Sequence, residues 1–485
     1  MKFRLNLSGM SPTRCRKPLP IHSLKEPRET LRDHEHRKMA AGYSSLGVPE
    51  HSVKPAQIFQ SCEGSLLYDA EGTPYLDLQM ASATSSFGYQ NKRLNQTLKE
   101  QLDRLPQLGS QYLHSEKVEV SARIARMSEK IFQKRGRVHF NVGGAGAVED
   151  AIKLVRNYTH KNAGFAFMGG DHGRTLGAAA ITSSYRHRRD YGHFGDRAHF
   201  VPYPYCFRCF YGLKREDCGL YCLKQFEKLF DTEYYSFWES KAGECEFGAL
   251  YMEPVQGTGG CVIPPKEYFV GLKKVLEERK VLLVDDEVTM GFFRTGKFWA
   301  IQHLEIAPDI VVFGNALTNG LNPLSGVWAT EELINPGIFP PGSTHSTYAA
   351  NPQGTAVALE VLKLLEEEDY EKKVTEKGRY FLDQLKALQK KYPKIMGDVD
   401  GLGLILRIEL CQEDGITPNP ELTLKIYQEG LKGDLKKNGK SYGLILNIGG
   451  YYKNVFSLSP SFEITKDEID TAVEFFDRLM ARCLK

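Results

Sequence analysis

The segment from Val281 to Gly320 reads VLLVDDEVTMGFFRTGKFWAIQHLEIAPDIVVFGNALTNG. Its first apolar run, 281–284, ends in Asp285-Asp286-Glu287. Carboxylates at the carboxyl end of a parallel strand lie where open α/β sheets bind their ligands. The segment therefore predicts a ligand site at the edge of a parallel sheet rather than a plain surface turn.

Apolar runs of similar length lie on both sides of this segment. They are RVHFNV (137–142), GFAFMGG (164–170), AHFVPY (198–203), FGALYMEPV (247–255) and DIVVFGNAL (309–317). Helical patterns separate several of them. Short strands that alternate with helices predict an α/β fold with a mostly parallel sheet covered on both faces.

Pattern and composition divide the chain into four segments. Residues 1–50 form a basic arm, since the first 40 residues hold ten Lys or Arg and four Asp or Glu. We expect the arm to wrap a partner subunit or to be solvated, because its acidic residues argue against a transit peptide. Residues 51–90 carry a hairpin pattern around Asp69-Ala-Glu-Gly72, residues 91–350 form the large domain, and residues 351–485 form a smaller α+β domain.

Composition excludes several classes of protein. The 485 residues include 63 Lys or Arg and 60 Asp or Glu, so a net charge of +3 gives no reason to expect nucleic acid or an anionic membrane as partner. No run approaches the roughly 18 apolar residues of a membrane span. We expect a cytoplasmic enzyme.

The motifs after Val281 occur in the order found in one enzyme family. The chain has D-E-V at 286–288, R-T-G at 294–296, P-D-I at 308–310 and G-x-A-L at 314–317, with EPVQGTGG at 253–260, HGRTLGA at 172–178 and THSTYAANP at 344–352. This order resembles the class III aminotransferases, which bind pyridoxal 5′-phosphate (PLP) in fold type I. The resemblance implies an amino acid or amine and a 2-oxo acid as substrates, and a homodimer with shared active sites.

The resemblance also implies a role for each motif residue. Asp286 would pair with the pyridine nitrogen and keep it protonated, so that the ring can accept electrons from the substrate Cα. A helix N-terminus after the glycine loop would bind the phosphate. The implied cofactor contacts are Gly143, Gly144, Ala145, Asp171, His172, Asp286, Val288, Asn315 and Thr347, the last reaching the neighbouring subunit.

One position departs from the family at the centre of its chemistry. The family has a lysine between Gly314 and Ala316, which forms a Schiff base with PLP and shuttles a proton. This chain has Asn315, and an amide nitrogen can neither form an imine nor act as a base near neutral pH. We therefore expect non-covalent PLP and lost or altered transamination, with Asn315 and Asp286 at the catalytic positions.

Further departures surround the same site. Asp171 stands where the family stacks an aromatic ring, Gly146 replaces a glutamate of the phosphate loop, and Ser457 replaces a substrate-binding arginine. Arg407 either substitutes for that arginine or faces solvent. Three explanations stay open: a laboratory lysine variant, a natural pseudoenzyme or partner subunit, and an enzyme of altered chemistry.

Four cysteines form a separate candidate site in an insertion at 203–225. Their spacing, C-x2-C-x8-C-x3-C, places four thiols in one short loop, where they can enclose zinc or an iron–sulfur cluster. The alternative is a set of reduced thiols with no metal. The residues concerned are Cys206, Cys209, Cys218 and Cys222.

Overall fold

A seven-stranded sheet forms the centre of the large domain in the computed structural model, which describes residues 30–45, 57–188, 191, 198–235 and 237–485. The strand order is β4-β12-β11-β10-β9-β5-β6. The parallel strands are β5 (Ala163–Phe167), β6 (His199–Val201), β9 (Phe247–Met252), β10 (Leu282–Asp286) and β11 (Ile310–Phe313). The predicted α/β fold with a mostly parallel sheet is confirmed.

One strand of this sheet was not predicted from the sequence. Strand β12 (Ser325–Thr330) runs antiparallel to β11 and to β4 (Gly136–Asn141). Gly326 allows this close pairing, because a Cβ there would lie 2.4 Å from the His139 carbonyl oxygen.

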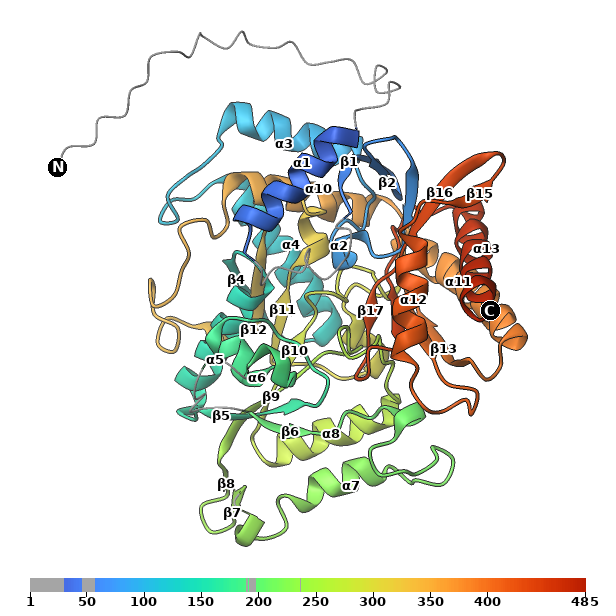
Figure 1. The fold of residues 1–485 in the computed structure, drawn as a ribbon. Coiled ribbons are helices and arrows are strands. Elements are labelled where there is room, and N and C mark those ends of the chain that lie inside the picture. Colours follow the sequence, from blue (N-terminus) through green and yellow to red (C-terminus); the bar gives the residue numbers. More distant parts are fainter. Residues whose placement is uncertain (1–29, 46–56, 189–190, 192–197, 236) are drawn as a thin grey trace, which may run out of the picture.

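Helices cover both faces of the central sheet (Figure 1). Helix α5 (Gly144–Thr159) packs on β11 and β12, α4 (Ser115–Phe132) packs on β4, and α8 (Lys266–Glu278) packs on β10. The helix pair α3 (Lys92–Arg104) and α10 (Pro352–Glu367) lies beside α4. Strands β9 and β11 are wholly buried, as expected for parallel strands between two helical layers.

Two smaller sheets accompany the large domain. The N-terminal strands β1 (Phe59–Glu63), β2 (Leu66–Asp69) and β3 (Pro74–Asp77) join the C-terminal strands β16 (Lys440–Ile445) and β15 (Leu435–Lys437) in one sheet. The other contains β13 (Met396–Leu402), β14 (Ile405–Leu410), β18 (Val455–Leu458) and β17 (Ile448–Gly449). Helices α11 (Tyr370–Lys391), α12 (Pro420–Gly430) and α13 (Lys466–Cys483) accompany them.

The remaining elements are short or peripheral. They are α1 (Thr30–Tyr43), α2 (Met80–Ala83), α6 (Leu176–Ile181), η3 (Tyr185–His187), η4 (Cys206–Arg208), α7 (Tyr221–Lys228), η5 (Glu233–Tyr235), β7 (Trp238–Glu239), β8 (Glu244–Cys245), η6 (Ala300–Leu304), η7 (Asn315–Thr318) and α9 (Glu331–Ile334). Helix α1 falls within the predicted arm, whose other residues lie almost entirely outside the described ranges. In the described part of the chain, no helix is both long and apolar enough to cross a membrane.

A buried arginine joins the large domain to the segments around it. Arg294 follows β10 and is fully buried. Its Nη1 donates hydrogen bonds to the Leu404 and Pro460 carbonyl oxygens, at 3.3 and 2.5 Å, and its guanidinium lies 4.4 Å from the Phe462 ring centroid. Burial lowers its pKa to about 9. Arg294 therefore braces the fold and does not line a pocket.

Candidate functional site

Asp286 lies at the carboxyl end of β10 and is fixed by two hydrogen bonds. His172, in the loop after β5, places Nδ1 2.8 Å from Oδ2, and the Val288 amide donates to Oδ1 at 3.1 Å. Both side chains are buried, with Asp286 7% and His172 4% exposed. The carboxyl ends of two parallel strands thus bring together residues 114 positions apart.

A third titratable group lies beside this pair. Glu253 follows β9, and its carboxylate accepts hydrogen bonds from the amides of Asp171 and Gly257 at 3.0 and 2.7 Å. Burial raises the pKa of Glu253 to about 7. Burial alone would lower the pKa of His172, but the hydrogen bond and charge of Asp286 raise it above its ordinary value.

The glycine loop before α5 packs close to the same residues. Gly143 has φ +78°, and its carbonyl accepts a hydrogen bond from Ser325 Oγ at 2.8 Å. A Cβ on Gly144 would lie 2.9 Å from Val288 Cγ1, so the start of α5 touches the residue bonded to Asp286. A Cβ on Gly173 would lie 2.6 Å from the Ala145 Cβ, which places the loop after His172 against the same helix end.

Asn315 approaches this cluster from the end of β11. A Cβ on the preceding Gly314 would lie 3.6 Å from Val288 Cγ1. Asn315 itself has φ +41°, a left-handed conformation that asparagine tolerates better than most residues. Its side-chain amide donates one hydrogen bond to the Ser82 carbonyl oxygen, at 3.3 Å.

Ser82 belongs to an unusual turn, α2. Its four residues, Met80 to Ala83, all have positive φ, from 45° to 63°. A left-handed conformation costs about 1–2 kcal/mol for each non-glycine residue. Asp77 holds the turn in place, because its Oδ1 accepts hydrogen bonds from the amides of Gln79 and Met80. Strain of this kind is concentrated at functional sites.

The residues that depart from the family pattern have their own local partners. Asp171 accepts a hydrogen bond from Thr258 Oγ1 at 3.3 Å. A Cβ on Gly146 would lie 2.8 Å from Asn141 Oδ1, and the Asn141 amide donates to the Gly146 carbonyl oxygen at 3.0 Å. Asn141 therefore fills the space beside position 146, which motif comparison alone did not reveal.

The chemistry of these residues suits two parts of the implied cofactor. Asp286, backed by His172, offers a carboxylate to a protonated ring nitrogen. The first-turn amides of α5, a helix of 16 residues, offer hydrogen-bond donors and the positive end of a helix dipole to a phosphate. Asn315 offers an amide and no amine.

Thr347 is on the loop before α10. Its side chain is exposed, and its carbonyl oxygen accepts a hydrogen bond from Gln107 at 3.4 Å. The end of the loop is held by His114, whose Nε2 lies 3.1 Å from the Ala350 carbonyl oxygen, and by Asn351, which accepts from the Gly354 amide.

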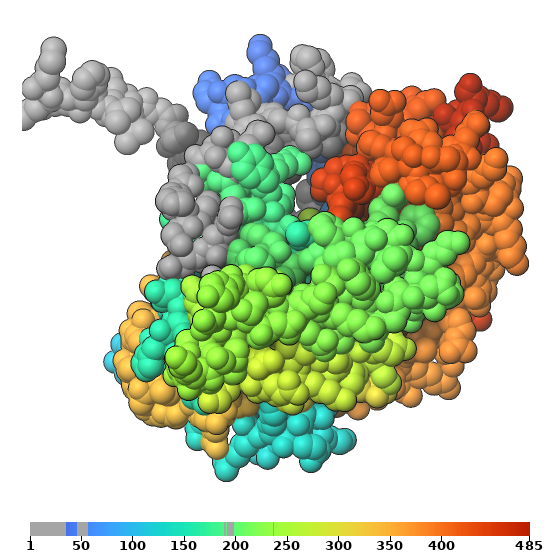
Figure 2. Space-filling view, turned by 90° about the horizontal axis from the view of Figure 1, so that it is seen from below, coloured from blue at the N-terminus to red at the C-terminus, as the bar shows by residue number. Residues whose placement is uncertain are grey.

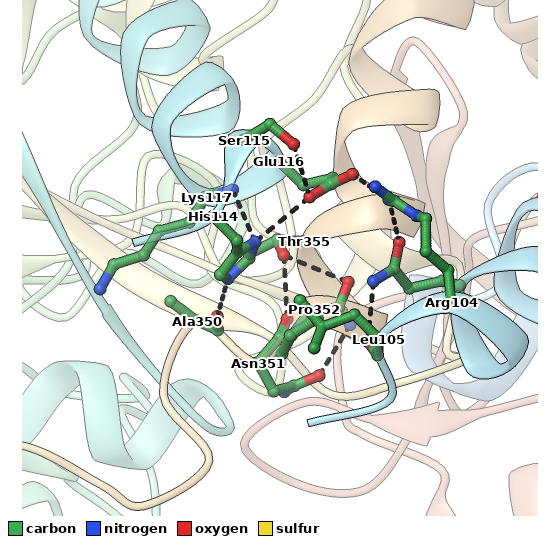
Figure 3. Close-up of polar contacts among 12 residues, drawn as sticks. Arg104, Leu105, His114, Ser115, Glu116, Lys117, Ala350, Asn351, Pro352 and Thr355 are labelled. Carbon is green, nitrogen blue, oxygen red and sulfur yellow. Dashed lines mark hydrogen bonds and ion pairs between the residues drawn. The ribbon is translucent and has the colours of Figure 1, made fainter. Parts of the chain in front are cut away.

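Glu116 supports His114 from the start of α4. It accepts hydrogen bonds from Ser115 and Arg104, and its Oε2 lies 3.3 Å from His114 Nδ1 (Figure 3). Burial alone would raise the pKa of Glu116, yet Arg104 and the other hydrogen bonds lower it to about 2. The base of the Thr347 loop is therefore rigidly held while Thr347 points outward.

The insertion that holds the four cysteines, drawn in green, lies at the surface beside C-terminal residues drawn in orange (Figure 2), and the four cysteines are half-buried. All four line one cavity of about 30 Å³, but the described residues include no group of three or more His, Cys, Asp or Glu that can hold a metal. Burial raises the pKa of Cys222 to about 11, and the other three thiols add to the shift. The predicted zinc or iron–sulfur site is thus unsupported. The residues concerned are Cys206, Cys209, Cys218 and Cys222.

Arg407 has neither of the roles predicted for it. It is 2% exposed, and its guanidinium forms ion pairs with Asp398 and Glu409. Tyr205 and Arg208 of the cysteine-rich insertion contact the same Glu409. Arg407 therefore joins the insertion to strand β14 and is occupied there, instead of facing solvent or a substrate.

Known proteins match nearly the whole chain. The sequence pattern of aminotransferase class III matches residues 48–480. An alanine/serine racemase from Pyrococcus horikoshii is 33% identical, over 90% of this chain and 87% of the racemase. A leucine/methionine racemase from Thermococcus litoralis is 30% identical, over 86% and 88%. The solved structure of a thermostable (S)-enantioselective omega-transaminase from Thermomicrobium roseum is 25% identical, with a TM-score of 0.80, over 93% of this chain and 99% of that one.

Proposed function

The chain belongs to the class III aminotransferase family, and from that premise we propose that it binds PLP without a covalent bond, together with an amino-group substrate. When bound, PLP supplies an electron sink for negative charge at the substrate Cα. The observation that carries the proposal is the buried Asp286 carboxylate, fixed by His172 and by the Val288 amide.

The chain's own residues divide the binding task. Asp286 would hold a proton on the nitrogen of a bound PLP ring, and the amides at the start of α5 would hold its phosphate. Gly144 and Val288 pack together between Asp286 and the start of α5. The distance between the Asp286 carboxylate and the helix amides is therefore set by packed backbone and side chain. Asn315 can donate or accept a hydrogen bond, but it cannot take up a proton near neutral pH.

We attribute Asn315 to natural divergence rather than to a single laboratory change. Two neighbouring departures fit their surroundings: Asn141 occupies the space beside Gly146, and the Ser457 side chain is buried where Gly449 leaves little room. A Cβ on Gly449 would lie 2.8 Å from Ser457 Oγ. One substitution at position 315 would not have produced these accommodations.

The substrate we propose is an α-amino acid or an amine, with altered chemistry relative to transamination. Two relatives at 30% identity or more are racemases of alanine/serine and of leucine/methionine. Both named reactions act on α-amino acids. The second candidate function is a non-catalytic subunit that binds PLP and regulates an active relative, and it is favoured by the missing amine at position 315.

Two measurements on the purified chain test the proposal. Titration with PLP should show saturable binding, and single-turnover experiments with amino acids should show little conversion of bound PLP. Asn315→Lys should raise the rate by about 10²–10⁴-fold, the usual contribution of a positioned acid–base group. Asn315→Met is the control, because methionine is similar in length to lysine and has no amine. If Asn315→Lys binds PLP without forming an imine, the transaminase reading fails.

We further infer a homodimer with shared sites. Thr347 lies on an exposed loop, and exposed apolar side chains gather on and near the segments that flank it. Tyr112 is 59%, Leu113 is 75% and Tyr348 is 62% exposed. Light scattering should give twice the chain mass of 54.7 kDa, and Tyr348→Asp should shift the distribution towards the monomer.

A further inference from the structure

Glu253 is a buried carboxylate to which no cationic side chain of the described residues is bonded. It is 7% exposed, and its hydrogen bonds within the described chain come from two backbone amides, those of Asp171 and Gly257. Each carboxylate oxygen therefore keeps a lone pair free for another donor.

His172 presents the matching group. Its Nδ1 lies 2.8 Å from Asp286 Oδ2, while Nε2 is buried and has no hydrogen-bond partner among the described residues. An unpartnered buried ring nitrogen is costly, because its interaction with water is lost without replacement.

The two free atoms border the same small space beside Gly170. A Cβ on Gly170 would lie 3.2 Å from His172 Nε2 and 3.7 Å from Glu253 Oε1. Glycine at this position therefore leaves the path between ring and carboxylate open. A proton can cross such a gap after a small side-chain movement or through one water molecule.

We propose that Glu253, His172 and Asp286 form one buried proton relay, in which Glu253 is the positioning residue that keeps His172 doubly protonated. The inference deepens the proposed function and rests on it, because Asp286 matters there as the partner of the ring nitrogen. In one passage, His172 starts with a proton on Nδ1 alone, and the Glu253 carboxyl gives its proton to Nε2, which leaves a Glu253 carboxylate beside a doubly protonated ring. Nδ1 then gives its proton to Asp286 Oδ2. The net charge of the three groups does not change.

The charges around His172 agree with this arrangement. Asp286 faces the ring from β10, Glu253 faces it from the segment after β9, and Asp171 adjoins it in the same loop. Burial alone would lower the pKa of His172, yet these three carboxylates raise it. Burial also raises the pKa of Glu253 to about 7, which places its proton within reach of exchange at neutral pH. The guanidinium of Arg407 is held by salt bridges with Asp398 and Glu409, so it is not paired with the carboxylates around His172.

Nitrogen-15 NMR of the histidine-labelled full chain, before PLP is added, tests the relay. The His172 signal is assigned by its loss in His172→Gln. In Glu253→Gln the pKa of His172 should fall by about one unit or more, the effect of removing an opposite charge at this range. Glu253→Asp, which keeps the charge, should retain most of the original value.

Glu149→Gln is the matched control. Glu149 is a carboxylate on α5 that accepts hydrogen bonds from Thr175 and from the Ala178 amide. This change should leave the pKa of His172 where it is. An unchanged pKa in Glu253→Gln, or an equal fall in Glu149→Gln, would overturn the relay.

A second measurement covers the case in which Glu253→Gln does not fold. In the unaltered chain, coupling to Glu253 should make His172 titrate in two steps, and a single step at the ordinary histidine pKa overturns the relay. Because both measurements precede PLP addition, they separate the two claims. If PLP binds but the titrations of His172 and Glu253 are not coupled, only the relay is wrong. If the titrations are coupled but PLP does not bind, only the proposed function is wrong.

Discussion

Asp286 and the Gly314-Asn315 step both adjoin Val288, but the protein holds Asp286 and Asn315 in opposite ways. Asp286 is buried and bonded to His172 and to the Val288 amide, with Glu253 behind them. Asn315 is half-buried, has a left-handed backbone, and makes one long hydrogen bond to the Ser82 carbonyl oxygen. The difference teaches that the side chain proposed to support a ring nitrogen is firmly held, while the side chain at the proposed attachment position is not.

The largest effect should come from breaking the Asp286 side of this comparison. Asp286→Asn keeps the shape and removes the charge, so the protonated ring nitrogen loses a charge-assisted hydrogen bond worth about 1.5–3 kcal/mol. PLP should bind at least tenfold more weakly, as measured by equilibrium dialysis. Equal affinity in Asp286→Asn and the unaltered chain would show that the ring does not rest on this carboxylate.

Gly146, in the first turn of α5, tests whether the residues that depart from the family pattern depend on their neighbours. Gly146→Ala places a Cβ 2.8 Å from Asn141 Oδ1, and such overpacking should lower the free energy of unfolding by about 1–3 kcal/mol. The loss should be smaller in an Asn141→Ala background, where the obstructing amide is absent. Urea denaturation of the four proteins measures the coupling, and additive losses would contradict it.

Glu287, the residue after Asp286, should make the free energy of unfolding depend on pH. Burial raises the pKa of Glu287 from 4.5 to about 7, so the folded state binds this proton more tightly than the unfolded state. That contribution to stability is complete below pH 4.5 and is lost as the pH rises to about 7.

Glu287→Gln should therefore flatten the fall in stability across this window, by an amount on the order of 1 kcal/mol. Thermal unfolding at pH 5 and pH 8 checks it. Glu305→Gln, which changes an exposed carboxylate, should leave the slope unaltered, and equal slopes in all three proteins would contradict the assignment.

The smallest effect should come from the turn that holds Asn315. Ser82 has φ +58°, and glycine adopts this conformation without steric penalty. Ser82→Gly keeps the carbonyl that accepts the Asn315 hydrogen bond and should change the free energy of unfolding by under about 1 kcal/mol, towards greater stability. A destabilised Ser82→Gly would mean that the serine side chain, not backbone strain, determines this turn.

Much of the fold followed from the sequence because parallel strands and the motifs after them are local patterns. The apolar run that ends in Asp285-Asp286-Glu287 predicted both strand β10 and the candidate site residue Asp286. Strand β12 was missed because its antiparallel pairing depends on Gly326 approaching β4, which no local pattern records.

The motifs named candidate site residues, but their contacts with one another depend on packing. His172 and Val288 both bond to Asp286, and the sequence predicted neither contact. The space filled by Asn141 and the burial of Arg407 depend on side-chain packing that no motif records. Arg407 is paired to Asp398 and Glu409, and it is stacked on Tyr205, 202 positions away in the chain. Cysteine spacing likewise predicts a shared loop but cannot set the directions of four thiols.

The central claim is that PLP binds beside Asp286 with no covalent bond to this chain. The direct test is to saturate the protein with PLP, reduce it with borohydride, and measure the intact mass. The unaltered chain should keep its own mass, while Asn315→Lys should gain the mass of one reduced PLP group. A PLP group attached to a single lysine of the unaltered chain, in proportion to its binding, would contradict the account.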